Sequence, residues 1–297
     1  MLKLPRARFL RNNQTTLNTL FFYGMFSEDN FQIHSFRLIM IRAKIIQVFL
    51  IGCAVFFGLL GMRLHTIIET EEAIVDFIVA QMDLDDLDDS EVVREATLTL
   101  GHFLSPRRVY SESVFDYRAD VQTIHNSPIT TVILNGGGAC GFSSELGVRV
   151  FQRLGFRPRF VQVLNAQNKT SHVVMDACRG DTYAVIDPIF GHVHLNADGQ
   201  FASLDDLQFS WQDIRQGLPD DTKISSYSYE YGVRFTNWNR LGWMAAPVKF
   251  MLKSIGMDTG KMSLRIWFNQ IRRILPYVYF SLSGLSLILV MLFVGKE

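Results

Sequence analysis

The sequence predicts an α+β domain flanked by two transmembrane helices, and three patterns lead to this prediction. Two uncharged apolar runs, at residues 45–62 and 275–295, have about the 20 residues that a spanning helix needs. Between them, apolar residues recur every four positions after Cys140, as in a helix that packs against a core. Strand-like segments at residues 171–178 and 181–187 then favour an antiparallel hairpin.

The composition agrees with a membrane protein that carries one folded domain. The chain has 297 residues, no net formal charge and 48% hydrophobic residues. Its mean hydropathy lies above zero, and the two apolar runs account for this. Residues 63–248, which lie between the runs, are enough for one domain with a sizeable core.

The charge distribution predicts where the remaining segments lie. Residues 1–44 form a basic N-terminal tail, which the positive-inside rule would keep in the cytoplasm. Residues 249–274 are also basic, and we expect an amphipathic juxtamembrane segment there, with a surface helix at residues 261–273. Two spans put both termini on one side of the bilayer. We therefore expect the domain to be extracytoplasmic, or periplasmic in a bacterium.

Cys140 is the first candidate for chemistry. The triplet Gly136–Gly138 precedes it, a helical pattern follows it, and Gly155 stands where a left-handed C-cap would end that helix. Unpaired N–H groups and the helix dipole favour a thiolate at a helix N-terminus. The position suits a nucleophile, and the Cys140 backbone N–H would be the first donor of an oxyanion hole, with Asn135 as a second.

His172 and Asp187 are the candidate partners of Cys140. If Arg179 and Gly180 form the two-residue loop of the hairpin, His172 lies directly opposite Asp187, with Cβ atoms about 5 Å apart. A carboxylate beside an imidazole fixes its tautomer and stabilises the imidazolium that forms when it takes a thiol proton. The three residues would form a Cys-His-Asp triad.

This order of motifs resembles the transglutaminase-like superfamily, a papain-like group of cysteine enzymes. The resemblance covers about residues 90–210 and includes the segment 154–161, with Arg159 at the usual arginine. It implies a papain-like core, in which N-terminal helices and a nucleophile helix pack on an antiparallel sheet. One departure is Gly141, because the family often has an aromatic residue directly after the nucleophile.

The resemblance implies a membrane-anchored enzyme that transfers acyl groups through a thioester, of amidase, peptidase or transglutaminase type. Its expected partners are the lipid bilayer and a protein, peptide or cell-envelope amide substrate. An alternative is a catalytically inactive module that acts as a membrane scaffold or binding protein. Arylamine acetyl transfer uses the same three residue types, but the sequence gives no signal for the acyl-CoA site that it requires.

The other motifs are weaker. His192 and His194 could bind a metal, but no third ligand is near in sequence, so an ordinary surface strand is favoured. The acidic run 83–91 lacks the central glycine of a calcium loop and fits a helix start better. Cys178 and Cys53 have no predicted chemical role. The alternatives are a disulfide between Cys178 and Cys140, and a lipid-attachment site at Cys53. We expect no cofactor, metal or nucleic acid.

Further elements complete the sequence prediction. Helices are expected at residues 67–82, 90–104 and 204–208. The aromatic residues toward the C-terminal end are expected at the membrane interface rather than in a substrate groove. They are Tyr227, Tyr229, Tyr231, Trp238 and Trp243.

Overall fold

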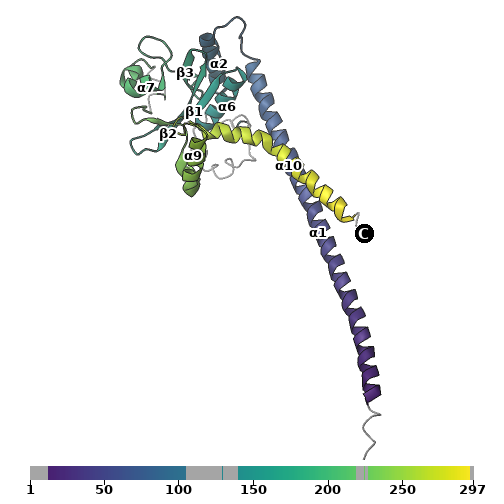
Figure 1. Cartoon of the computed structure of the whole chain (residues 1–297). Coiled ribbons are helices and arrows are strands. Elements are labelled where there is room, and N and C mark those ends of the chain that lie inside the picture. The colour runs from purple at the N-terminus through teal and green to yellow at the C-terminus, as the bar shows by residue number, and fades with distance from the viewer. Residues whose placement is uncertain (1–12, 105–128, 130–139, 219–223, 225–226, 295–297) are drawn as a thin grey trace, which may run out of the picture. The chain divides into compact units, whose positions relative to one another are not determined.

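The protein is a mixed α+β chain with one antiparallel sheet, as the sequence predicts (Figure 1). The computed structural model describes residues 13–104, 129, 140–218, 224 and 227–294, and it describes the side chains of those that lie between residues 40 and 293. The helices are α1 (Asn13–Val79), α2 (Asp89–Leu104), α6 (Cys140–Arg153), α7 (Leu204–Phe209), α8 (Trp211–Gln216), α9 (Ala245–Ser254), α10 (Leu264–Val294) and the 3-10 helix η3 (Trp238–Met244). The strands are β1 (Arg157–Leu164), β2 (Thr170–Arg179), β3 (Thr182–Asp187), β4 (His192–Val193) and β5 (Val233–Arg234).

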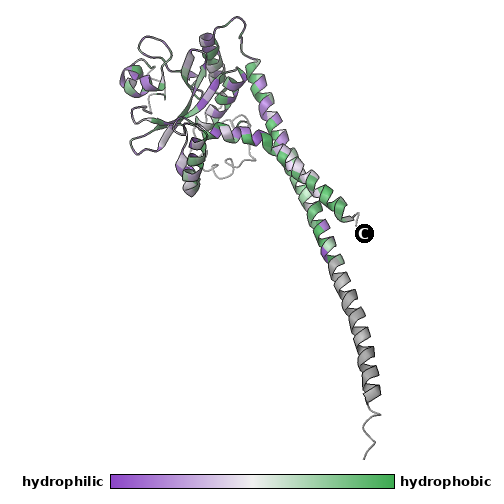
Figure 2. Cartoon of the chain, viewed as in Figure 1, coloured by the Kyte–Doolittle hydropathy of each residue, from purple (hydrophilic) through white to green (hydrophobic). Residues whose placement is uncertain are grey.

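Two compact units make up the chain. Residues 62–276 form one unit, and residues 1–61 together with 277–297 form the other. The second unit contains the most apolar parts of α1 and α10, which Figure 2 shows in green. Residues 40–79 and 264–293 are long and apolar enough to cross a membrane.

Within this apolar unit, α1 and α10 approach each other closely through small residues. The Ser283 hydroxyl donates to the Ala54 carbonyl at 2.8 Å, and a side chain at Gly61 would lie only 3.0 Å from the ring of Phe280. Small residues allow two helix backbones this approach, which is how helices gain packing energy in lipid.

The sequence predicts separate elements for each apolar run and the helix next to it, and this prediction is wrong. α1 continues through the expected gap to Val79, so the first run and the helix expected at residues 67–82 are one element. Likewise, most of the expected surface helix at residues 261–273 belongs to the first part of α10, which begins at Leu264, and Pro276 lies inside α10. A change from apolar to polar residues alters what a helix faces but does not end it.

The sheet has the strand order β4-β3-β2-β1-β5 with antiparallel neighbours. Side chains alternate between its two faces. Phe160 and Met175 belong to a core with α2 and α6, whereas Val161 and Val174 belong to a second core with α7 and α8. The sheet is therefore buried on both sides.

The predicted hairpin register needs a correction. Arg179 pairs with Thr182, so the loop is Gly180 and Asp181 rather than Arg179 and Gly180. Gly180 has φ +55°, a conformation that favours glycine, and it takes the first loop position. Moving the loop by one residue shifts the pairing by two, and each side chain keeps its predicted face.

Both helices that cover the first face have defined ends. The carboxylate of Asp88 accepts from the N–H groups of Ser90 and Glu91 at 2.8 and 2.9 Å, so this part of the acidic run starts α2, as predicted. Gly155 has φ +82° just after α6, which confirms the predicted left-handed cap. Arg179 then donates to the Leu154 carbonyl at 2.6 Å and binds the side chain of Asp89.

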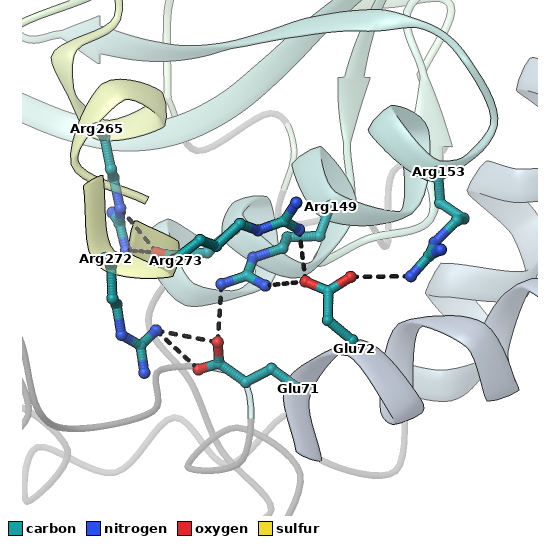
Figure 3. Close-up of polar contacts among 8 residues, drawn as sticks. Glu71, Glu72, Arg149, Arg153, Arg265, Arg272 and Arg273 are labelled. Carbon is teal, nitrogen blue, oxygen red and sulfur yellow. Dashed lines mark hydrogen bonds and ion pairs between the residues drawn. The ribbon is translucent and has the colours of Figure 1, made fainter. Parts of the chain in front are cut away.

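A cluster of ion pairs joins three helices in the unit of residues 62–276 (Figure 3). Glu71 of α1 is fully buried and accepts from Arg149 of α6 at 2.7 Å and from Arg272 of α10 at 2.9 Å. Its neighbour Glu72 binds Arg273 of α10 at 2.5 Å. Burying a carboxylate is costly unless charges pair with it. The arginines therefore fix the helix that begins at Cys140 to both α1 and α10.

Candidate active site

Cys140 is the first residue of α6 and is half-buried. Two contacts set the position of this helix on the sheet. The Ser144 hydroxyl donates to the Val173 carbonyl of β2 at 3.0 Å. Farther along, a Cβ at Gly147 would lie 2.8 Å from both the Met175 sulfur and the Pro188 ring, so only glycine allows the helix this close. The close packing brings Cys140 to His172.

The three residues predicted from the sequence lie together. His172 Nε2 is 2.7 Å from Asp187 Oδ2, and Cys140 lies close enough to His172 to contribute to its raised pKa. Because Nε2 faces the carboxylate, Nδ1 is the ring nitrogen left for the thiol. Asp187 ends β3, and the β2–β3 register, in which Met175 pairs with Ile186, does not place His172 directly opposite it as predicted. His172 therefore reaches Asp187 diagonally across the hairpin.

The charged forms of His172 and Asp187 stabilise each other at this site. Burial works against a charged imidazole, but the nearby Asp187 carboxylate and hydrogen bonds with Asp187 and Cys140 raise the pKa of His172 to about 10. Burial would similarly raise the pKa of Asp187, yet His172 and the Tyr227 hydroxyl hold that pKa below its usual value. The geometry favours an imidazolium beside a carboxylate at neutral pH.

Tyr227 is the site residue that sequence reasoning missed. Its hydroxyl donates to Asp187 Oδ2 at 2.6 Å, and its ring stacks on the imidazole of His172 with centroids 4.1 Å apart. Tyr227 and Tyr229 are buried, so their expected place at the membrane interface is wrong, whereas Tyr231 and Trp243 are exposed. A tyrosine 40 residues after the aspartate leaves no local pattern that would reveal this contact.

His192 and His194, the predicted surface pair, are also placed differently from the prediction. His194 is fully buried rather than on a surface strand, and Tyr229 Oη lies 3.0 Å from its Nε2. The rings of His192 and His194 are 5.0 Å apart. Within the described ranges, no three His, Cys, Asp or Glu side chains are grouped closely enough to hold a metal ion.

The remaining candidates are the possible disulfide of Cys140, Arg159 and Asn135. Cys53, Cys140 and Cys178 are free, so the Cys140–Cys178 disulfide is not formed. Arg159, at the usual arginine of the resemblance, binds Asp176 of the neighbouring strand at 2.5 Å. Asn135, the suggested second oxyanion donor, lies outside the described residues.

The comparisons with known proteins add no relative. No protein-family model matches the chain, and no curated protein or solved structure gives a significant match. The functional argument therefore depends on the site itself.

Proposed function

We propose that this protein is a membrane-anchored, cysteine-dependent acyl-transfer enzyme in which Cys140, His172 and Asp187 act as a triad. The observation that carries the proposal is that Cys140 lies beside His172, whose Nε2 is 2.7 Å from Oδ2 of the buried Asp187. A histidine beside a thiol can take part in the proton transfers that make the sulfur a nucleophile. The resemblance to the transglutaminase-like superfamily supports the same chemistry.

The proposed reaction has two steps. In the first, the Cys140 thiolate attacks the carbonyl carbon of an amide, a C–S bond forms, and the C–N bond breaks as His172 gives its proton to the departing amine. In the second, His172 takes a proton from water or an amine, which attacks the thioester and releases Cys140. Asp187 orients His172 through Nε2 in both steps, and Tyr227 holds the carboxylate. The acyl substrate is a protein, peptide or cell-envelope amide.

We propose further that the domain faces away from the cytoplasm. The two apolar helices support membrane association, and the basic tail at residues 1–44 supports a cytoplasmic N-terminus. The arginines that precede the second apolar run have a structural role in the fold, because Arg272 and Arg273 pair with Glu71 and Glu72. Their position is therefore explained without a cytoplasmic location.

The test is the alkylation rate of Cys140 in the full chain in detergent, followed by mass spectrometry. An ordinary cysteine, with a pKa near 8.5, is less than about 1% thiolate at pH 6. We expect iodoacetamide to modify Cys140 at least about tenfold faster than Cys178 at pH 6, and the His172→Ala variant to lose this advantage. Equal rates at the two cysteines in the unsubstituted protein would reject the triad and favour an inactive scaffold.

The same thiols report the orientation. A membrane-impermeant maleimide applied to intact cells should label Cys140 if the domain is outside. Labelling that requires broken cells would place it in the cytoplasm.

A further inference from the structure

Arg265, near the start of α10, is held against the nucleophile helix (Figure 3). Its Nε and one terminal nitrogen donate to Oε2 of Glu145 at 2.9 and 2.6 Å. Glu145 is a buried residue of α6, and the guanidinium carbon lies 4.8 Å from the ring centroid of Phe160. These contacts fix a side chain that would otherwise be mobile.

The guanidinium occupies the space beside Gly141, the residue directly after Cys140. Its other terminal nitrogen, Nη1, lies 3.1 Å from where a Cβ of residue 141 would be. With standard backbone dimensions, Nη1 is then within about 9 Å of the Cys140 Cα. A side chain at position 141 would displace the guanidinium, so glycine keeps this place open for Arg265.

One edge of the guanidinium has no acceptor among the described residues. An arginine has five N–H groups, and Glu145 takes the edge formed by Nε and Nη2. The edge formed by Nη1 and Nη2 remains, with two parallel N–H bonds. The Arg265 side chain is 38% exposed, so solvent reaches part of it. Two parallel donors match the two oxygens of a carboxylate.

We infer that Arg265 binds a carboxylate on the acyl part of the substrate, and so selects amides whose acyl residue carries a free carboxylate near the scissile bond. This inference rests on the proposed function, because it assigns the substrate class of the same site. Neutralising Glu145 needs only the Nε and Nη2 edge. The second edge, directed to the residue after the nucleophile, is the feature that indicates a ligand.

The experiment compares two alkylating reagents that differ mainly in charge. Iodoacetate carries a carboxylate and iodoacetamide a neutral amide, and the readout is the ratio of their rates at Cys140 in the full chain in detergent. We expect Arg265→Gln to lower the iodoacetate-to-iodoacetamide ratio by about five- to tenfold, as loss of a half-exposed charge contact would do. A ratio within about twofold of the original would overturn the inference.

Two further variants make the result specific. Arg273→Gln removes an arginine of the same helix that binds Glu72 instead, and it should keep the original ratio. The double variant Glu145→Gln/Arg265→Gln removes the buried carboxylate as well. Its ratio should also fall. If the double variant regains the original ratio, the effect of the single change came from an unpaired Glu145, and the inference is wrong.

Failure of the proposed function gives a different result. In that case Cys140 reacts with iodoacetamide no faster than Cys178 and does not depend on His172. If Cys140 reactivity does depend on His172 while the reagent ratio ignores Arg265, only the carboxylate site is rejected.

Discussion

His172 and His194 are both buried against the same sheet, yet their pKa values are shifted in opposite directions. His172 is 7% exposed and contacts the Asp187 carboxylate, which helps raise its pKa to about 10. His194 is 0% exposed and contacts the Tyr229 hydroxyl, and burial, with the nearby His192, lowers its pKa to about 3. Burial alone therefore makes an imidazole neutral, and a bound carboxylate reverses this.

Replacing Asp187 with Asn should have the largest effect on this contrast. The imidazole of His172 would lose its carboxylate, so its pKa should fall below the usual 6.5, and the Cys140 alkylation rate at pH 6 should fall about 100-fold or more. Histidine NMR and mass spectrometry measure the two changes in the full chain.

Asp176→Asn is the matched control for this change. Asp176 is a second buried carboxylate of the sheet, and it binds Arg159 and Tyr183 rather than a histidine. Its replacement should destabilise the domain without lowering Cys140 reactivity. An equal loss of reactivity in both variants would show that general damage, not the contact with His172, explains the Asp187 result.

The pH dependence of stability should differ in sign between the two histidines. A raised pKa means that the contribution of His172 is complete below about pH 6.5 and is lost as the pH rises toward 10. A lowered pKa means that the contribution of His194 is complete above about pH 6.5 and is lost as the pH falls toward 3. Each slope reaches at most about 1.4 kcal/mol per pH unit.

Unfolding midpoints of the His172→Gln and His194→Gln variants, relative to the unsubstituted protein, measure these slopes. The first difference should shrink between pH 6.5 and 10, and the second between pH 6.5 and 3. Two differences that shrink in the same direction would contradict the assigned charges.

The smallest predicted effect separates two tyrosine hydroxyls. Tyr227→Phe removes a donor to Asp187 and should lower the Cys140 alkylation rate about three- to tenfold, near 1 kcal/mol. Tyr229→Phe removes a hydroxyl from the same segment that lies against the neutral His194, and it should leave this rate unchanged. Equal rates in the two variants would show that the hydroxyl on Asp187 has no part in activating the thiol.

Local patterns were enough to predict much of the site. The glycine lead-in to Cys140, the cap at Gly155 and the alternation of the hairpin all act within a few residues. A one-residue error in the loop changed the pairing of His172 but not the face it shares with Asp187, because side chains alternate with a period of two. The predicted contact between His172 and Asp187 is therefore present despite the error in the loop.

The features that could not be predicted depend on contacts between residues far apart in sequence, or on the absence of residues that end a helix. Tyr227 reaches Asp187, and Arg272 reaches Glu71, only after the chain has folded. The continuity of α1 also escaped prediction, because charged residues such as Glu71 and Glu72 are good helix formers and no proline or glycine lies between residues 62 and 79. Polarity indicates what surrounds a helix, whereas caps indicate where it ends.

The Glu71 cluster has a consequence for biosynthesis. Glu71 and Arg272 are 201 residues apart, so the N-terminal part of the cluster leaves the ribosome long before its C-terminal partner. Until α10 is translated, Glu71 can pair with Arg149 but not with Arg272. Its buried carboxylate then lacks one of these two charged partners. We therefore expect the helix that begins at Cys140 to reach its final position only after α10 has been translated. We expect an unfinished chain to hold Cys140, His172 and Asp187 without all of the ion pairs that position α6, so this site would form only after α10 has been made.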